Sequence, residues 1–153
     1  LSYPGSAATV AIRISGYREA LSTSGTSYEA EFVQRFDPSQ EPAVRRMVES
    51  IRPDAIICAN DGTAGILMRS LIALGYHIPK DIRIAGFDDL KYASLLPVPL
   101  TTIHQPWRNI GEAAMAAMIE RVSRPDMPAR DILLGCKLVV RASCGAGLGR
   151  KLK

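Results

Sequence analysis

The stretch that decides the fold is residues 55–86, which read AIICANDGTAGILMRSLIALGYHIPKDIRIAG. Residues 55–59 are a short continuous apolar run, typical of a parallel strand that is covered on both faces. Residues 60–62, Asn-Asp-Gly, open a helix that stops at Gly75, and residues 82–86 form a second buried strand. Strand, helix and strand within about thirty residues predict the βαβ unit of a doubly wound, parallel α/β sheet.

The sequence on either side continues this alternation. At 153 residues the chain is about the size of one ordinary domain, so we expect one globular unit. Predicted helices cover about residues 6–24, with Ser6 as the cap, 41–51, 90–96 and 107–122. Predicted strands cover residues 30–36, 100–103, 132–134 and 138–140.

The composition indicates a soluble, folded protein with 47% apolar and 22% charged residues. The longest apolar run, Ala113 to Ile119, is far shorter than the roughly 20 residues of a membrane span, and the first residues lack the pattern of a signal peptide. The net charge is +4, but Arg150, Lys151 and Lys153 supply most of the excess at the end of the chain. Without a basic stripe bearing aromatic residues, we expect no membrane contact and no DNA contact by this chain.

The cysteines and histidines predict no metal, cofactor or disulfide. Cys58, Cys136 and Cys144 are odd in number and form no CxxC pair, while His77 and His104 lie far apart in the sequence. Reduced thiols indicate a cytoplasmic protein.

Polar residues follow two predicted strands at their carboxyl ends, where open parallel sheets bind ligands. Asn60 suits either a ligand contact or a turn, and Asp61 is expected to cap the following helix. Asp88 is expected to accept hydrogen bonds from a vicinal diol, and Asp89 to cap the 90–96 helix. No nucleophile elbow, catalytic His motif or phosphate loop accompanies them, so we expect no enzyme and no catalytic residue.

Several motifs, in order, resemble the effector-binding core of the lactose-repressor (LacI/GalR) family of transcription regulators. They are Pro53-Asp54-Ala55-Ile56-Ile57, Ala59-Asn60-Asp61, Ile78-Pro79-Lys80-Asp81-Ile82, Gly86-Phe87-Asp88-Asp89 and Pro99-Leu100-Thr101-Thr102-Ile103 with Gln105-Pro106. Arg13 with Gly16-Tyr17, and Leu138-Val139-Val140-Arg141, extend the resemblance over nearly the whole chain.

The resemblance implies a periplasmic-binding-protein-like fold of type I, in which two lobes close on a small molecule such as a sugar. Residues 1–103 and 130–145 would form most of the second lobe, and residues 106–123 a helix of the first lobe. Such regulators are about twice this long, so the chain is expected to be a partial effector-binding domain without the DNA-binding headpiece.

The resemblance also implies ligand contacts by Arg13, Phe36, Asn60, Asp88 and Gln105. Three alternatives stay open: Arg13 as a solvated helix charge, Phe36 as a core residue, and Trp107 either lining the cleft or packing.

The predicted helix over residues 62–74 carries a second apolar stripe, formed by Gly65, Met68 and Ile72. Together with Leu95 and Leu96 it predicts the interface of a homodimer, as the resemblance implies; a scatter of exposed apolar residues is the alternative.

The sequence therefore predicts the sensing module of a bacterial LacI-type regulator, with a small-molecule effector and DNA as a partner only through a headpiece that this chain lacks. Two alternatives remain: a periplasmic solute-binding protein of a sugar transport system, and an enzyme on a doubly wound sheet.

Overall fold

A parallel pair of strands forms the centre of the molecule. The computed structural model describes residues 1–5 and 8–146. Strand β1 (Ala55–Ile57) pairs in parallel with β2 (Arg83–Ala85), and helix α3 (Asp61–Ala73) connects them. The predicted βαβ unit is therefore confirmed.

Single bridges widen this pair in both directions. On one side the amino group of Leu1 donates to the carbonyl of Ile57, and Ser2 in turn bridges Arg35 in parallel. On the other side Thr101 forms a parallel bridge with Ala85. The chain thus builds a parallel sheet from very short segments, with β1 and β2 as its regular ladder.

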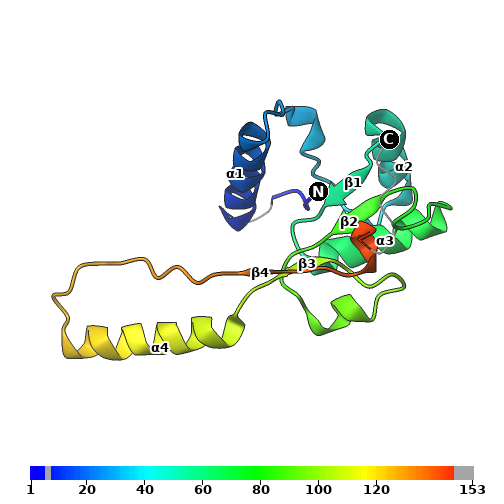
Figure 1. Ribbon diagram of the computed structural model, residues 1–153. Helices are drawn as coiled ribbons and strands as arrows, with labels where there is room; N and C mark the ends of the chain where they lie inside the picture. The colour runs from blue at the N-terminus through cyan, green and yellow to red at the C-terminus, as the bar shows by residue number, and fades with distance from the viewer. Residues whose placement is uncertain (6–7, 147–153) are drawn as a thin grey trace.

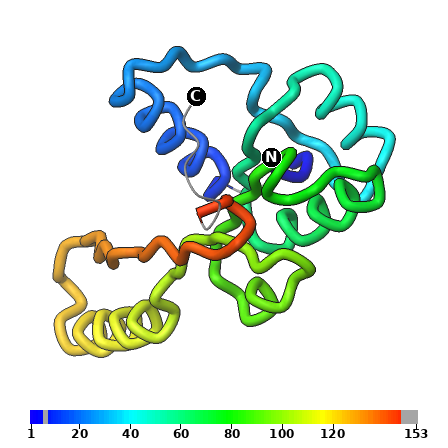
Figure 2. The backbone as a smooth tube through the Cα atoms, turned by 45° about the vertical axis from the view of Figure 1, so that its right-hand side comes forward, coloured from blue at the N-terminus to red at the C-terminus, as the bar shows by residue number. Residues whose placement is uncertain are grey.

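Helices lie on both sides of this sheet (Figures 1 and 2). Helix α2 (Glu41–Ile51) packs against α3, and α3 packs on β2. Helix α1 (Ala8–Thr23) lies on the opposite side of β1 from α2 (Figure 1). The doubly wound arrangement follows from this placement.

The core lies on the α2 and α3 side of the sheet. Its buried apolar residues are Val44, Met47, Val48, Ile56, Cys58, Ala64, Leu67, Met68, Leu71, Ile78, Ile82, Ile84, Ala93 and Leu100. The other face of β1 is open, because Ile57 is 64% exposed. The prediction that this strand is covered on both faces is therefore wrong for this chain, since no residue of α1 is buried against it.

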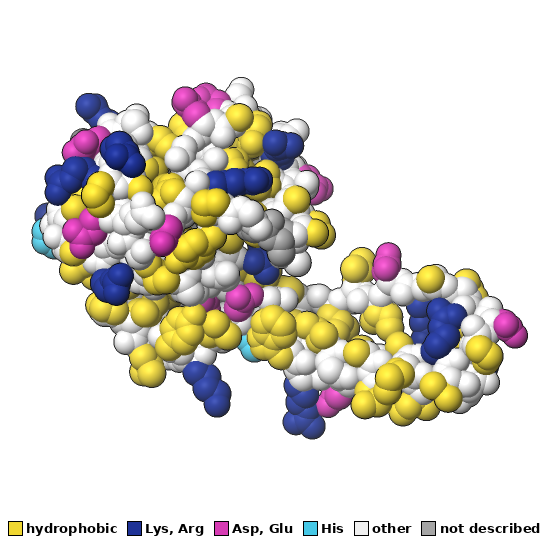
Figure 3. All heavy atoms as spheres, turned by 180° about the vertical axis from the view of Figure 1, so that it is seen from behind, with side chains coloured by type: hydrophobic (Ala, Val, Ile, Leu, Met, Phe, Trp, Pro, Cys, Tyr) yellow, Lys and Arg dark blue, Asp and Glu magenta, His cyan; other side chains and the backbone are white. Residues whose placement is uncertain are grey.

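A long hairpin-shaped arm projects from this body (Figure 1). Strand β3 (Thr102–His104) leads out to helix α4 (Trp107–Ser123), and the chain returns to β4 (Lys137–Val139), which pairs antiparallel with β3. We call residues 105–136 the arm and the other described residues the body. Apolar side chains are exposed along the arm (Figure 3).

Short 3-10 helices complete the body: η1 (Ala30–Phe32), η2 (Lys91–Ser94) and η3 (Ala142–Cys144). The strand predicted over residues 30–36 is wrong in its first half, where η1 forms. In this segment, Arg35 forms a parallel bridge with Ser2, and the residues of η1 have no such strand partner.

A second predicted strand is also wrong. Residues 132–134 belong to no strand, and Leu133 is 92% exposed, because no segment in the described part of the chain offers them a ladder. The Ser6 cap and the basic end of the chain lie outside the described residues.

Candidate functional site

Polar side chains from separate segments come together at the carboxyl ends of the strands. Asp88 follows β2, Gln105 follows β3, and Arg13 reaches over from α1. The Phe87 ring lies under the Arg13 guanidinium, and the Trp107 indole donates to the Asp88 carbonyl. We call these five residues the Asp88 cluster.

Asp88 is the centre of the cluster and is held from several directions. Its backbone has a φ of 118°, and its N–H donates to the carbonyl of Ile103 at 2.9 Å. Its Oδ1 accepts a hydrogen bond from Nε2 of Gln105 at 2.7 Å. The indole Nε1 of Trp107 donates to its carbonyl at 3.3 Å. The rare backbone angle therefore persists because the surrounding segments fix it.

Arg13 faces Asp88 without forming a close ion pair. Its Nη2 lies 3.7 Å from Oδ1 of Asp88, and both side chains are partly exposed. The Cζ atom lies 4.0 Å from the centre of the Phe87 ring, in cation–π geometry. The guanidinium also donates to the carbonyl of Ala59, just after β1. These contacts hold the Arg13 guanidinium beside the Asp88 carboxylate. They argue against the alternative that Arg13 is only a solvent-exposed charge on α1.

Burial raises the pKa of Asp88 above its usual value. The hydrogen bond from Gln105 and the positive charge of Arg13 oppose this rise, while the nearby carboxylate of Asp61 adds to it. A partly desolvated carboxylate and a guanidinium together accept and donate hydrogen bonds within a few ångströms. That combination suits a molecule with adjacent hydroxyl groups, and the 51% exposed Trp107 offers an apolar face beside it.

Asn60 takes one of its two predicted roles, the turn, whereas the predicted capping by Asp61 is wrong. Asn60, not Asp61, caps α3, because its Oδ1 accepts from the N–H of Thr63 at 2.8 Å. The half-buried Asn60 thus has the turn and capping role, and its contact with a ligand stays a prediction. Asp61 is fully buried and accepts hydrogen bonds from Thr102 and Leu90.

Phe36 packs against the hydrophobic core as a partly buried residue. Among the described residues, no hydrogen bond, ion pair or ring contact connects it with the Asp88 cluster. The structure brings Arg13, Asp88 and Gln105 together but gives Phe36 a packing role.

Asp89 binds two residues of the body that flank the arm, His104 and Arg141. Its carboxylate accepts from Arg141 at 2.7 Å and lies 3.0 Å from Nδ1 of His104. Arg141 also donates to the carbonyl of Leu100. The predicted capping of the 90–96 helix by Asp89 is therefore wrong, because Arg141 attracts its carboxylate away from the end of that helix.

The second apolar stripe of α3 is less exposed than predicted. Met68 is fully buried in the core, so its predicted place at a dimer interface is wrong. Leu96 packs onto α3 at Gly65, where an added Cβ would lie 3.3 Å from it. Ile72 is 43% exposed and Leu95 is 81% exposed. The outer surface of this region therefore consists of Ile72 and Leu95, not of the whole stripe.

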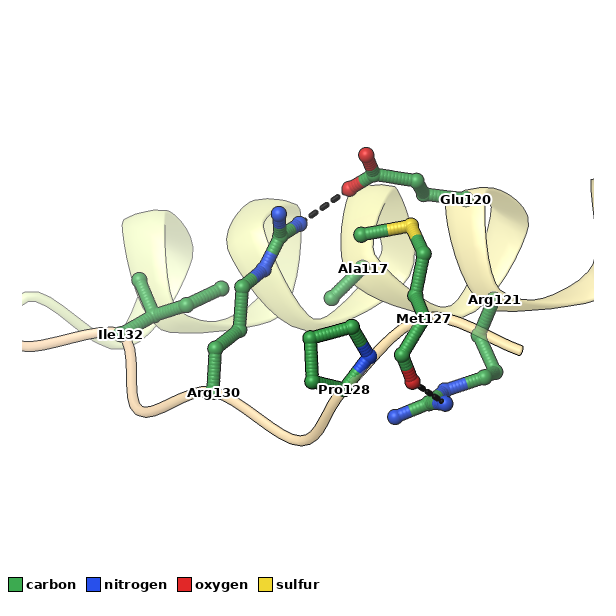
Figure 4. Close-up of a pocket in the computed structure, with 7 residues that line it drawn as sticks. All are labelled: Ala117, Glu120, Arg121, Met127, Pro128, Arg130 and Ile132. Carbon is green, nitrogen blue, oxygen red and sulfur yellow. Dashed lines mark hydrogen bonds and ion pairs between the residues drawn. The ribbon is translucent and has the colours of Figure 1, made fainter. Parts of the chain in front are cut away.

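A separate hollow lies in the arm, away from the Asp88 cluster (Figure 4). Its lining residues are Ala117, Glu120, Arg121, Met127, Pro128, Arg130 and Ile132. Arg130 pairs with Glu120, and Arg121 donates to the carbonyl of Met127, so its polar groups serve to join α4 to the returning chain (Figure 4).

Two structural features are absent from residues 1–5 and 8–146: a cluster of metal-ligating side chains and a membrane-spanning helix. Within these ranges, no three His, Cys, Asp or Glu side chains come close enough to hold a metal ion. None of the helices described there is both long and apolar enough to cross a membrane.

The fold agrees with a comparison against protein-family models. Residues 2–144 match the model described as a periplasmic binding protein-like domain. The chain belongs to this family. This match confirms the predicted fold class, and the relatives and solved structures that follow confirm the resemblance to LacI/GalR regulators.

Curated relatives in the family are named as repressors. The ribose operon repressor of Escherichia coli (strain K12) is 31% identical over 136 residues, covering 86% of this chain and 41% of the repressor. The HTH-type transcriptional repressor PurR of Photobacterium profundum is 33% identical over 135 residues, covering 86% and 40%. The chain thus spans about two fifths of the length of these relatives.

Solved structures of transcription regulators superpose on this chain. The transcriptional regulator CelR in complex with cellobiose superposes with a TM-score of 0.81 at 26% identity, covering 94% of this chain and 45% of that one. A LacI-type transcription regulator from Bifidobacterium animalis subsp. lactis gives 0.77 at 30% identity, covering 88% and 50%. The chain therefore has the fold of about half of such a regulator.

Phe87 is the site residue whose role sequence reasoning did not identify. It directly precedes Asp88, and its ring lies under the guanidinium of Arg13. The signal in the sequence is an aromatic residue beside a carboxylate at the end of a strand, and the partner on α1 is not evident from it.

Proposed function

We propose that this chain is the effector-sensing part of a LacI-type transcription regulator and binds a small polyhydroxylated molecule, such as a sugar, at the Asp88 cluster. The observation that carries the proposal is the convergence of Arg13, Asp88 and Gln105 at the carboxyl ends of the strands. A relative named for the ribose operon and a neighbour in complex with cellobiose support a sugar.

Calorimetric titration of the 153-residue chain tests this with a panel of ribose, cellobiose and sucrose. We expect at least one to bind, and Asp88→Ala to weaken that binding by about tenfold or more, because a charge-assisted hydrogen bond is lost. Asp126→Asn, an exposed carboxylate in the arm, is the matched control and is expected to bind normally. Equal binding by Asp88→Ala, or no binding of any sugar, would contradict the proposal.

The arm supports the proposed division into lobes. Residues 1–103 and 130–145 would form most of the second lobe, and α4, within residues 106–123, would belong to the first. The exposed apolar side chains of α4, including Met115, Met118, Ile119 and Val122, suit a helix that packs into another lobe. A ligand held between lobes would then shift the population of closed forms and so alter DNA binding through a headpiece.

A homodimer is the proposed assembly, with the exposed Ile72 and Leu95 at its interface and with Leu96 packed against Gly65. Exposed apolar residues on one face of a helix pair favour such an isologous contact. Met68 has no part in this surface.

The regulator is proposed to act in the cytoplasm, without a membrane partner, cofactor or enzymatic activity. The periplasmic solute-binding protein remains the second candidate because it shares the fold. The repressor names of the curated relatives favour the regulator.

A further inference from the structure

Asp61 is a buried carboxylate that ligand recognition by the Asp88 cluster does not use directly. It is fully buried at the start of α3. Its two oxygens accept hydrogen bonds from two other segments: Oδ1 from the Thr102 hydroxyl at 2.5 Å and Oδ2 from the Leu90 N–H at 2.9 Å. Its backbone N–H donates to the carbonyl of Phe87 at 2.9 Å. One residue therefore joins α3, β3 and the segment that carries Asp88.

The contacts of Asp61 lie on either side of Asp88. The Phe87 carbonyl precedes Asp88 and the Leu90 N–H follows it. Between them, Asp88 and Asp89 have φ values of 118° and 54°, both in a region that side chains other than glycine rarely adopt. A positive φ is unfavourable for each of these two residues. The segment therefore keeps this conformation only if contacts on both sides of it hold the backbone in place.

Gly86 also lies in close contact with the Asp61 carboxylate. A Cβ at Gly86 would overlap Oδ1 of Asp61 and come within 2.9 Å of Leu100. The backbone of the segment thus rests directly on the Asp61 carboxylate. A side chain there would move the segment or the carboxylate.

We propose that Asp61 is the positioning residue of the site, which fixes the 87–90 segment so that Asp88 faces Arg13 and Gln105. Asp61 acts through Asp88 and does not touch the ligand. This inference rests on the proposed function, since Asp88 is the group that it holds for a ligand.

Amide hydrogen exchange in the ligand-free, full 153-residue chain tests the positioning. Asp61→Ala is expected to raise the exchange rates of Asp88 and Leu90 by about tenfold or more, because the Leu90 N–H loses its acceptor. Asp61→Asn is expected to stay within about threefold of wild type, because its amide oxygen still accepts from Leu90.

Ser70→Ala is the matched control. Ser70 is also buried on α3, and its hydroxyl donates to the Pro38 carbonyl at 2.7 Å. Its replacement is expected to leave the exchange rates of Asp88 and Leu90 unchanged. If Asp61→Ala does not fold, Thr102→Val removes the donor to Asp61 while preserving shape, and it is expected to accelerate exchange at the same two amides.

The proposal is overturned if the variant that folds leaves these amides at wild-type rates, or raises every amide by one common factor. Titration with the sugar that binds wild type separates the two proposals. Loss of affinity in Asp61→Ala by about tenfold, with rescue in Asp61→Asn, is expected. Faster exchange in a chain that binds no sugar would preserve the positioning role and contradict the sensing function.

Discussion

The body and the arm each contain a helix with apolar residues at helical spacing, but only the body buries them. Helix α3 in the body buries Ala64, Leu67, Met68 and Leu71, whereas α4 in the arm buries no residue. Both helices show apolar residues at helical spacing, so the pattern alone does not distinguish them. Amphipathic spacing therefore identifies the helix face that must be buried, while tertiary contacts decide whether this chain itself buries that face.

Thiol reactivity gives the largest expected contrast between the two regions. Cys136 is exposed in the arm, while Cys58 is buried in the body and burial raises its pKa to about 12. At pH 8 only about one Cys58 in ten thousand is then ionised. We expect a disulfide reagent such as DTNB to react with Cys136 at least about a thousandfold faster than with Cys58.

Absorbance at 412 nm follows this reaction, and Cys136→Ser should remove the fast phase. Rapid labelling of Cys58 in the native protein would show that the body opens easily and would contradict the expected difference in thiol reactivity.

Replacing one leucine by alanine in each region compares how much the body and the arm contribute to the free energy of unfolding. Leu71 is fully buried in the body, and Leu133 is almost fully exposed in the arm. Leu71→Ala should lower the free energy of unfolding by about 2–5 kcal/mol, since it removes buried surface and leaves a cavity. Leu133→Ala should change it by less than about 0.5 kcal/mol. Urea denaturation measures both, and similar losses would mean that the arm is covered in solution.

The same contrast explains what sequence could predict. The βαβ unit followed from residues 55–86 because strand, cap and helix signals there are local. The placement of Asp88 followed from the rule for strand ends, and the resemblance supplied Arg13 and Gln105. Asp88 and Gln105 come together because strands that run in parallel end at one edge of the sheet, and Arg13 reaches them from α1.

The failures depend on contacts between distant segments. Asn60 and Asp61 are adjacent, and either side chain could cap α3. Asn60 is the cap because Thr102 and Leu90 bind the Asp61 carboxylate in the folded chain. Met68 has the same spacing as an exposed residue but is covered in the core. No local pattern contains such information.

The contribution of the Asp89 contacts with Arg141 and His104 to the stability of the fold should depend on pH. The hydrogen bond from Arg141 lowers the pKa of Asp89, and the contact with His104 acts in the same direction, although burial opposes both. A lowered pKa stabilises the fold above the usual carboxyl pKa near 4, and this contribution is lost as the pH falls through the lowered value.

Asp89→Asn should therefore cost about 1.5–3 kcal/mol of unfolding free energy at pH 7 and less below pH 4. Urea denaturation at pH 7 and pH 3 checks this, with Asp126→Asn as the control. A cost that is constant with pH would show that the charge of Asp89 does not stabilise the fold.

Charge substitutions on the exposed apolar surfaces of α3 and α4 test which of the two mediates self-association. The expected change in dimer affinity is about tenfold. Ile72 lies on α3 in the body and Val122 on α4 in the arm; both are exposed. If copies pair through α3 and η2, Ile72→Lys brings two like charges near a two-fold axis and should weaken the dimer by about tenfold or more. Val122→Lys should leave the association constant unchanged. Sedimentation equilibrium at tens of micromolar measures both variants against wild type. A monomeric wild type would refute the dimer, and a response to Val122→Lys alone would assign association to the arm, whose apolar side chains would then be covered by a second copy.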